Sequence, residues 1–526
     1  MDFYSKCYSR NPTDPLVSPL FGDVSGLPPS LIFAGKDEVL LDDSRRMHNK
    51  LVSSGCTSEL VEAEGMWHAY VLYCIKERAC DLDRINAFLN RFLSHERKLR
   101  WMRLDNAAKI YPAAKRRKWN NFFRLSATLC DEVDKTVLRN AMDVTMRRFP
   151  SIAVRLCRGA FWYYLEELSS APEITDEKSW PLAHTPFESI NECALRVIVY
   201  KNRIAVEFYH ALTDGTGGMV FLKSLLAEYI EQKYGVEISN ECGVLDRLTQ
   251  PQEEELEDSF SKNAGSVSVS RNASTAFKIH YTPERDDFRH LTTFILDSNA
   301  ALAAAKICGV SLTVYLTSAM LLALQRIQDE QTPDKRRQKP IRVVVPVNLR
   351  RLFPSRTLRN FVHVIMPEID PRMGDYEFSE ILTSVKHQLG LLVTKKNLCA
   401  MFTPNVNAER SPLLRVMPLF LKNIAMKLVY DTVGERTNCL NLSNLGDIKV
   451  PDAMRRYVTR FDFILGVQAT KPNNCGVLSY NGKLYMNFIR NTVEPVLEFQ
   501  FYQVLRELGL HVKVESNGAG NVLIPN

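Results

Sequence analysis

An apolar strand, a short turn and an amphipathic helix follow one another between residues 203 and 235, and this order constrains the fold most. The strand ends at His210, and the turn after it carries Asp214-Gly215. Apolar residues at helical spacing then indicate a helix, for which Gly235 supplies a stop. The spacing puts a histidine where it can act as a general base and an aspartate where it can hold the turn in shape.

Length and composition describe an ordinary globular chain of several domains. The 526 residues exceed the size at which one core usually splits, and 45% hydrophobic with 24% charged residues is a typical balance. The net charge of +7 is small, and two basic runs at residues 115–118 and 335–339 are expected to be solvated loop charge. A phosphate contact, for example to coenzyme A, is the alternative. Neither run has the context of a nucleic-acid module, so no nucleic-acid partner is predicted.

Cysteine usage and hydropathy predict a cytoplasmic protein without an integral membrane segment. The 12 cysteines show no Cys-x-x-Cys pair and no Cys/His ligand spacing, which indicates reduced thiols and no metal site. The amino terminus lacks an apolar leader, and no stretch reaches the ~18 uninterrupted apolar residues of a membrane span. Residues 312–324 and 414–429 are the longest candidates, and polar interruptions favour buried or amphipathic helices there.

Four segments follow from the pattern of elements. Residues 1–97 show strand, helix, strand and helix in turn, which predicts an α/β unit with parallel strands. Residues 100–240 contain a hairpin signal around Lys201-Asn202 and the opening motif. Residues 241–275 are rich in Ser, Asn and Gly, so we expect a flexible connector or surface loop. Residues 276–526 mix strands and helices, with a second hairpin signal at Asn481-Gly482.

The first segment resembles the carboxyl-terminal part of α/β-hydrolases of the hormone-sensitive-lipase-like esterase group. The matching text is Asp14-Pro15-Leu16-Val17-Ser18-Pro19-Leu20, Leu27-Pro28-Pro29-Ser30-Leu31-Ile32, Gly35-Lys36-Asp37-Glu38-Val39-Leu40 and Gly65-Met66-Trp67-His68-Ala69-Tyr70. The resemblance implies that Asp37 occupies the position of the triad acid and His68 that of the triad base.

The nucleophilic serine of such a triad is missing from the sequence. No Gly-x-Ser-x-Gly elbow and no His-Gly-Gly oxyanion segment occurs. Without a nucleophile, an aspartate and a histidine cannot form an acyl-enzyme, so these two positions are expected to be vestigial. We therefore expect either that the chain begins inside a longer hydrolase gene, as the tail of an esterase–acyltransferase fusion, or that the hydrolase has decayed. Exposed strand edges in so short a piece predict poor solubility.

From Trp101 onward the chain resembles the chloramphenicol-acetyltransferase-like superfamily, which includes condensation domains, BAHD acyltransferases, polyketide-associated acyltransferases and alcohol acetyltransferases. Its His-x-x-x-Asp-Gly signature is met by His210, Asp214 and Gly215. Further matching text is Trp101-Met102-Arg103-Leu104-Asp105-Asn106-Ala107-Ala108, Val345-Pro346-Val347-Asn348-Leu349-Arg350 and Leu442-Ser443-Asn444-Leu445-Gly446. The alcohol-acetyltransferase-like group is the most similar.

This resemblance implies two similar lobes, each a mixed sheet with flanking helices, and a tunnel between them with the histidine at its middle. Residues 100–240 would form the first lobe and residues 276–526 the second. The family's aspartate pairs with an arginine, and Arg147, Arg148 and Arg155 are the candidates here.

The same resemblance and local physics suggest roles for four residues of the site, Gly215, Asp214, Ser443 and Asn444. Gly215 is expected to allow a tight turn. A helix cap by Asp214 is compatible with its pairing to an arginine. Ser443 and Asn444 are candidates for stabilising an oxyanion.

The function implied is transfer of an acyl group, acetyl above all, from coenzyme A to an alcohol, with His210 as general base. Acyl-CoA is then a co-substrate and no cofactor is bound. Condensation on an acyl carrier protein and a non-catalytic scaffold are the alternatives. Tyr209 stands where condensation domains have a second histidine, and residues 462–466 lack the BAHD pattern Asp-Phe-Gly-Trp-Gly. Both departures favour ester formation.

Overall fold

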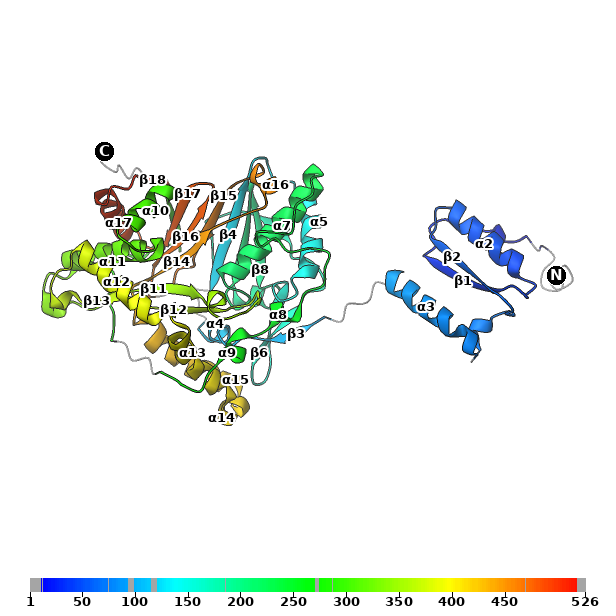
Figure 1. Ribbon diagram of the computed structural model, residues 1–526, viewed down its shortest axis with the longest axis horizontal. Coiled ribbons are helices and arrows are strands. Elements are labelled where there is room, and N and C mark those ends of the chain that lie inside the picture. Colours follow the sequence, from blue (N-terminus) through cyan, green and yellow to red (C-terminus); the bar gives the residue numbers. More distant parts are fainter. Residues whose placement is uncertain are drawn as a thin grey trace. The chain divides into compact units, whose positions relative to one another are not determined.

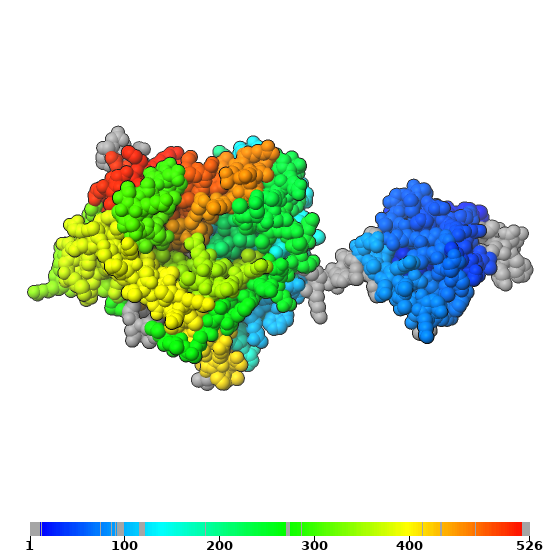
Figure 2. All heavy atoms as spheres, viewed as in Figure 1, coloured from blue at the N-terminus to red at the C-terminus, as the bar shows by residue number. Residues whose placement is uncertain are grey.

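The computed structural model describes residues 11, 13–73, 75–92, 99–114, 121–184, 186–269, 274–285, 287–468 and 470–517. The chain divides into two units, Met1–Lys98 and Leu99–Asn526. Figures 1 and 2 draw the first unit in blue and the second from cyan to red. The basic run at residues 115–118 lies outside the described residues.

The first unit contains the α/β order expected from its sequence. Strands β1 (Ser30–Gly35) and β2 (Ser58–Ala63) are parallel and in register from Ser30 opposite Ser58. Helix α2 (Leu41–Ser53) connects them and α3 (Ala79–Phe92) follows, with short turns of 3-10 helix at η1 (Pro19–Phe21), η2 (Tyr70–Leu72) and η3 (Lys76–Arg78). These two strands form the whole of the described sheet in this unit, so the outer edge of each is unpaired there.

The amino-terminal half of the second unit is built on a five-stranded sheet with the order β15-β4-β9-β8-β7. Its strands are β4 (Phe122–Leu129), β7 (Ile174–Asp176), β8 (Leu195–Tyr200), β9 (Arg203–Tyr209) and β15 (Val458–Ile464). Strand β15 comes from the carboxyl-terminal half and pairs antiparallel with β4. The lobes are therefore not the two separate sequence segments expected, because residues 276–526 complete the first lobe's sheet.

The β8–β9 hairpin forms where the sequence predicts it. Lys201 adopts a φ of 51°, a left-handed conformation that closes the turn between the two strands. A smaller sheet, β3-β6-β5, lies beside this lobe and consists of β3 (Trp101–Arg103), β5 (Val154–Arg158) and β6 (Tyr163–Glu167).

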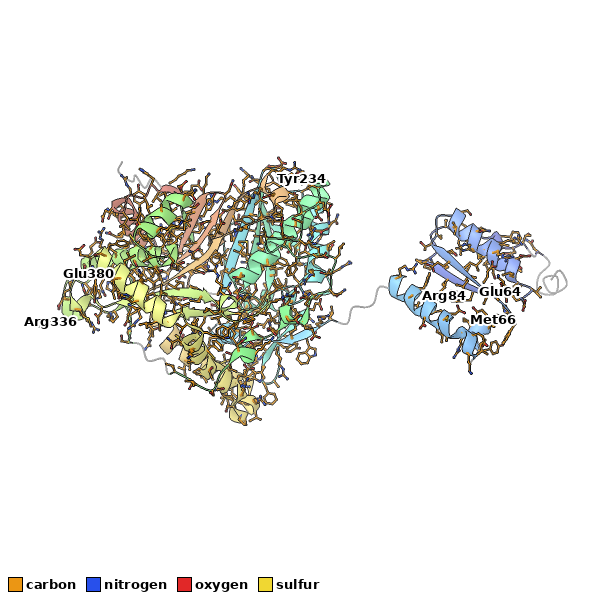
Figure 3. The ribbon with its side chains drawn as sticks, viewed as in Figure 1. Glu64, Met66, Arg84, Tyr234, Arg336 and Glu380 are labelled. Carbon is orange, nitrogen blue, oxygen red and sulfur yellow. The ribbon has the colours of Figure 1, made fainter. Side chains whose placement is uncertain are left out.

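Two helices pack on each other beside the first lobe's sheet. They are α5 (Lys135–Arg148) and α7 (Gly215–Tyr234), and α7 also packs on β4. Most of α7 is buried, on more sides than a surface helix with one apolar stripe would be. Its last residue, Tyr234, is labelled in Figure 3. The ring of Tyr234 stacks on that of Tyr457 with centroids 4.2 Å apart. Gly235 follows with φ 66° and ends the helix.

The second lobe has an eight-stranded sheet with the order β12-β11-β14-β16-β17-β10-β18, and β13 pairs with β11. Its strands are β10 (His290–Asp297), β11 (Ile341–Asn348), β12 (Val362–Ile365), β13 (Glu368–Ile369), β14 (Leu440–Asp447), β16 (Asn473–Tyr480), β17 (Lys483–Arg490) and β18 (Lys513–Ser516). The helices that pack on one another around α11 are α10 (Ser298–Ile307), α11 (Leu312–Gln331), α12 (Phe378–Leu392) and α17 (Val496–Glu507).

The segment between the lobes is ordered where it is described, contrary to the flexible connector expected. It contains α8 (Glu253–Leu256) and α9 (Ser259–Asn263). The Arg148 guanidinium donates to both carboxylate oxygens of Glu255, at 2.5 and 2.7 Å, and both side chains are buried. The polar composition suggested a loop, but this ion pair and the peptide hydrogen bond from Leu358 to Glu255 hold the segment against the core.

The remaining helices lie mostly in the carboxyl-terminal half. They are α4 (Ile110–Ala113), α6 (Phe187–Ile190), α13 (Lys395–Arg410), α14 (Pro412–Val416), α15 (Leu419–Val429), α16 (Asp452–Arg455) and the short helical turns η4 (Lys335–Arg337), η5 (Leu349–Arg351), η6 (Pro371–Met373) and η7 (Tyr430–Glu435). Within the described ranges, no single helix has the length and apolar character of a membrane span, although α10 and α11 taken together do and meet at 84°.

Candidate active site

A cavity of about 790 Å³ lies between the two sheets of the second unit. Its wall includes Phe123 from β4, Gly215 from the start of α7, Thr313 from α11, Asn348 from β11 and Ser443 from β14. Both lobes thus contribute to one cavity, whose volume lies in the range of small-molecule sites.

His210 lines this cavity directly after β9, where its peptide N–H donates to the Asn121 carbonyl at 2.7 Å. The imidazole stacks on Tyr111 with centroids 4.7 Å apart and meets the ring of Phe123 at 5.0 Å. Burial lowers the pKa of His210 from its ordinary value of 6.5, against the opposing effects of its own backbone carbonyl, Asp214 and Asn360. Burial thus favours the neutral imidazole, which is the form that can accept a proton.

The hydrogen bond with Asn360 indicates which nitrogen of His210 carries the hydrogen. Its Nδ2 donates to Asp105 Oδ2 at 3.3 Å, so its Oδ1 is turned toward His210 Nδ1, also at 3.3 Å. An amide oxygen only accepts, so Nδ1 carries the hydrogen and Nε2 carries the lone pair. Neither Asn360 nor Asp105 was recognised as a site residue from the sequence, although Asp105 belongs to the matched segment 101–108.

Asp105 anchors this arrangement from a fully buried position. Its Oδ1 accepts from the Ala108 peptide N–H at 2.7 Å, and the Arg359 guanidinium lies 3.8 Å away. Burial raises the pKa of Asp105 to about 6, while Arg359 opposes that rise. The ionised carboxylate is the form that orients Asn360, because it can only accept hydrogen bonds.

Asp214 joins the two lobes just beyond the histidine. One carboxylate oxygen accepts from the peptide N–H groups of Thr216 and Gly217, at 3.1 and 3.0 Å, and so caps α7. The other accepts from Arg350 Nη1 and from the Phe361 peptide N–H, both at 2.8 Å. Asp214 is almost completely buried, and it contributes to the wall of the cavity beside His210.

The arginine that pairs with Asp214 is therefore Arg350, and the expected candidates are wrong. Arg148 pairs with Glu255, and Arg155 pairs with Glu166 across the β5–β6 ladder. Arg147 belongs to the last turn of α5, whereas the second carboxylate oxygen of Asp214 accepts from Arg350 and the Phe361 peptide N–H. The error has a physical origin: Arg350 lies 136 residues from Asp214, so no local signal connects them.

Gly215 and Gly217 let α7 begin in close contact with the other lobe. Gly215 has no left-handed φ, so the tight turn expected of it is not what restricts this position. A Cβ there would lie 2.7 Å from Cδ2 of Leu445. At Gly217 the restriction is stricter, because a Cβ would lie 2.2 Å from the Leu358 carbonyl oxygen.

Ser443 and Asn444 both line the cavity from β14. Asn444 Nδ2 already donates to Thr313 Oγ1 at 3.2 Å, and its Oδ1 accepts from the Gly446 peptide N–H at 2.8 Å. Ser443 stands opposite Gly476 in the ladder with β16. Both are in reach of a ligand, and a role in binding an oxyanion stays a prediction for each.

In the first unit, the partner of His68 is not Asp37. The imidazole Nδ1 lies 2.7 Å from Glu38 Oε2, whereas Asp37 is exposed and its peptide N–H donates to Met66. The contact of His68 is thus with the neighbouring carboxylate, and the assignment of Asp37 to the position of the triad acid stays a prediction. The Glu38 carboxylate and the His68 imidazole are therefore in contact, and of the two side chains His68 is the exposed one.

The basic run at residues 335–339 is loop charge rather than part of the cavity wall. Lys335 Nζ lies 2.7 Å from Asp329 and also pairs with Asp375, and Arg337 lies 3.7 Å from Asp334. Arg336 projects at the outer edge of the second lobe in Figure 3.

Comparisons with known proteins separate the two units. A family model described as the alpha/beta hydrolase fold matches residues 1–72. An esterase of Acinetobacter venetianus is 42% identical over 62 residues, which is 12% of this chain and 20% of that protein. An acetyl-hydrolase of Streptomyces hygroscopicus is 40% identical over 63 residues, 12% of this chain and 21% of that one. The chain thus spans about a fifth of the length of the curated relatives it matches.

Solved structures resemble the second unit. TRI101 of F. graminearum, crystallised with ethyl coenzyme A, superposes with a TM-score of 0.53 at 8% identity, over 79% of this chain and 99% of that one. The trichothecene 15-O-acetyltransferase TRI3 of Fusarium sporotrichioides gives 0.46 at 12%, over 78% and 94%. The superposition on TRI101 shows that the second unit has the two-lobed chloramphenicol-acetyltransferase-like fold, as the sequence resemblance predicted.

Proposed function

We propose that the second unit transfers an acyl group from a coenzyme A thioester to an alcohol, with His210 as the general base. The observation that carries the proposal is the imidazole of His210 on the wall of a cavity that both lobes form, with Nδ1 held by Asn360. The crystal structure of TRI101 with ethyl coenzyme A supports a coenzyme A thioester as donor, because that protein shares the fold.

The chemistry needs one proton acceptor and no covalent enzyme intermediate. His210 Nε2 removes the alcohol proton as the oxygen attacks the thioester carbonyl, and a tetrahedral intermediate forms. The carbon–sulfur bond then breaks, and the imidazolium returns the proton to the departing thiolate. Proton transfer of this kind typically contributes ~10²–10⁴-fold to rate, and the cavity adds the benefit of holding both substrates together.

The test is release of coenzyme A thiol from acetyl-CoA in the presence of a panel of alcohols. His210→Ala should lower kcat/KM by ~10²–10⁴-fold with an unchanged thermal unfolding midpoint. Asn121→Ala, which removes a side chain near the histidine but not the imidazole, is the control for local disturbance. Equal activity of the folded His210→Ala protein and the wild type would refute the proposal.

Condensation on a carrier protein is the second candidate, because the His-x-x-x-Asp-Gly signature at His210, Asp214 and Gly215 is shared with the condensation domains that the sequence resembles. Tyr209 in place of a second histidine favours ester formation instead. Comparing acyl groups on free coenzyme A with the same groups on a phosphopantetheine carrier separates the two donors.

For the first unit we infer no separate hydrolysis by the described residues. Asp37, Glu38 and His68 supply an acid and a base, but the sequence holds no Gly-x-Ser-x-Gly elbow for a nucleophile. Ester hydrolysis would require a serine from elsewhere, and purified chain incubated with p-nitrophenyl acetate should release nitrophenol no faster than its His68→Ala variant.

A further inference from the structure

One end of the cavity carries a buried lysine whose charge no described side chain neutralises by contact. Lys471 lines the cavity and is 4% exposed, and its Nζ has no hydrogen bond or salt bridge to any described residue. The turn that carries it is held by a β-bridge in which the peptide groups of Gln468 and Lys471 donate to each other's carbonyls, at 2.9 and 3.1 Å. Burying an amine without a partner costs stability, so the position calls for a reason.

Two further polar groups beside it lack partners on the same wall. Asn438 Oδ1 and Gln468 Oε1 are buried without a hydrogen bond, and both residues line the cavity. The neighbouring Lys278, by contrast, is satisfied, because its Nζ donates to the carbonyls of Glu435 and Asn438. Buried polar atoms are normally paired, so two unpaired amide oxygens beside the lysine on one cavity wall indicate a missing polar ligand group.

The charges at this end favour an anion. Two lysines, Lys278 and Lys471, lie close enough to act on each other, and Glu435 is the one carboxylate that acts on both of them. Burial and Lys278 lower the pKa of Lys471 to about 7, so an arriving carboxylate would restore its full charge and pair with it. A carboxylate accepts from the ammonium, and a water molecule or a hydroxyl of the ligand can donate to the two amide oxygens.

The lysine lies at the opposite end of β14 from the histidine's surroundings. Glu435 and Cys439, whose charges affect the pKa of Lys471, precede β14 in the chain. Leu445, near the other end of β14, lies against the start of α7 at Gly215. At ~3.3 Å per residue, Cys439 and Leu445 lie about 20 Å apart. A ligand that touches both ends must therefore be extended.

We propose that the cavity is built for a substrate that carries a carboxylate at the end remote from the reacting group, and that Lys471 recognises this carboxylate. The inference rests on the proposed acyl transfer for the identity of the reacting group, but the lysine site itself can be tested without turnover. An extended ω-hydroxy carboxylic acid, with its alcohol near His210 and its carboxylate on Lys471, is the simplest acceptor of this class.

The experiment compares binding of ω-hydroxydodecanoate and its methyl ester to the full chain by calorimetry. The wild type should bind the acid about tenfold to hundredfold more tightly than the ester, the usual effect of one charge-assisted hydrogen bond. Lys471→Met should remove that preference, and Lys483→Met, which alters an exposed lysine, should keep it. Lys471→Gln serves as a second variant, and each variant's thermal midpoint reports its folding.

His210→Ala distinguishes the two proposals, since it should abolish turnover yet keep the preference for the acid. An equal preference in the folded Lys471→Met protein and the wild type would overturn the carboxylate site. If the wild type turns over none of the alcohols but still prefers the acid to the ester, only the acyl transfer is refuted.

A second, independent observation concerns the surface of α15. Phe420 and Ile424 are 55% and 57% exposed at a spacing of four residues, and Val416, 68% exposed, precedes them at the same spacing. Leu421 beside them is 44% exposed. A surface helix normally buries such a stripe, and this one presents it to solvent.

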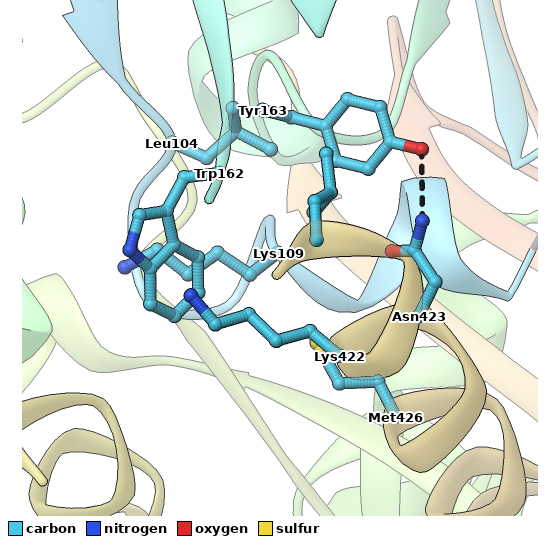
Figure 4. A pocket seen from close by; sticks show the side chains of 8 residues that line it. Leu104, Lys109, Trp162, Tyr163, Lys422, Asn423 and Met426 are labelled. Atoms are coloured by element: carbon cyan, nitrogen blue, oxygen red, sulfur yellow. Dashed lines mark hydrogen bonds between the residues drawn. The ribbon is translucent and has the colours of Figure 1, made fainter. Parts of the chain in front are cut away.

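The side of α15 that faces the body of the unit carries polar groups together with Leu419 and Met426, and Figure 4 shows its polar contacts. Lys422 Nζ lies 3.6 Å from the Trp162 ring centroid and donates to the Phe161 carbonyl at 2.9 Å. Asn423 Nδ2 donates to the Tyr163 hydroxyl at 3.2 Å. Because polar contacts fix this side against the body of the unit, the helix cannot turn its apolar stripe inward.

The chemistry of the segment identifies its partner. Residues 412–429 contain no acidic residue, and their exposed charges are the basic ones of Arg415 and Lys427, since Lys422 is buried. An exposed apolar stripe with only basic charge is typical of a helix that lies in the interface of an anionic bilayer. The helix also continues into η7, where Tyr430 and Gly434 line the cavity, so a bound bilayer would stand beside the cavity wall.

The structure points to α14 and α15, the gold protrusion at the lower edge of the second unit in Figures 1 and 2, as a docking surface for anionic phospholipid. Co-sedimentation of the full chain with vesicles of phosphatidylcholine and phosphatidylglycerol is the test. Phe420→Asp with Ile424→Asp should reduce the bound fraction at least tenfold, and Ile307→Asp, at an 86% exposed apolar residue of α10, should not. Binding that is unchanged in the double variant, or a dimer that the double variant dissolves in the absence of vesicles, would overturn the proposal.

Discussion

Replacing Asp214 by alanine should destabilise the second unit by about 4 kcal/mol. The carboxylate caps α7 through Thr216 and Gly217, and losing an N-cap typically costs ~1 kcal/mol. It also neutralises Arg350, whose side chain is only 12% exposed, and removing one partner of a buried pair costs ~3–5 kcal/mol. Arg350 keeps its hydrogen bonds to the carbonyls of Thr357 and Arg359. The cost of breaking the ion pair should therefore lie at the lower end of that range, at ~3 kcal/mol.

Two matched variants separate the cap from the ion pair. Asp214→Ser keeps an oxygen for the cap but is too short to reach Arg350, so it should be ~1 kcal/mol more stable than Asp214→Ala. Arg350→Met leaves the cap intact but removes the cation together with its hydrogen bonds to the Thr357 and Arg359 carbonyls, so it should lose at least the part that the pair contributes. Urea unfolding of the full chain, followed by circular dichroism, gives the midpoints and slopes that these comparisons need.

The reasoning would be refuted by either of two results. If Asp214→Ala shifts the free energy of unfolding by less than 1 kcal/mol, the carboxylate does not hold the lobes together as its hydrogen bonds indicate. If serine and alanine at this position are equally stable, the cap contributes nothing. A change in the urea slope would show that the variant alters the unfolded or native surface instead.

Three further outcomes are expected. Because burial lowers the pKa of His210 below 6.5, kcat/KM should rise with pH through a midpoint under 6.5 and stay level above it; a pH–rate profile with its midpoint above 7 would contradict this. Asn360→Leu removes the acceptor of Nδ1 and should lower kcat/KM about tenfold, the effect of one hydrogen bond, while a profile and rate like those of the wild type would count against the assigned tautomer. Gly217→Ala forces a Cβ onto the Leu358 carbonyl and should lower stability in thermal unfolding by ~1–3 kcal/mol or more. Gly215→Ala should have a smaller effect, because only a leucine methyl must move there. The reverse order of the two variants would disprove the packing argument.

Elements with a local cause were predicted from the sequence. Asn481 and Gly482 adopt φ values of 50° and 76°, as a two-residue turn requires, and β16 and β17 pair on either side. Likewise, Gly235 ends α7 in the left-handed conformation that its position indicated. Signals of this kind lie within a few residues of the structure they specify, so one sequence is enough to find them.

Partners far apart in the chain could not be found in the same way. Asp214 and Arg350 are separated by 136 residues, and Asn360 and Asp105 by 255. Each residue alone has the composition of an ordinary turn or strand end, and only the fold brings the pairs together. The expectation of a loose connector failed for a similar reason, because the ion pair that orders Glu255 joins it to Arg148, 107 residues earlier.

Strand β15 gives the second unit a demanding folding order. The Thr459 hydroxyl donates to the Thr128 carbonyl across 331 residues, so the sheet beside the histidine lacks a strand until nearly the whole chain has left the ribosome. Contacts of such long sequence separation form slowly, and the edge of β4 stays open to wrong pairing meanwhile. A nascent chain arrested before residue 458 should therefore depend on chaperones for its solubility, and residues 99–240 produced alone should aggregate.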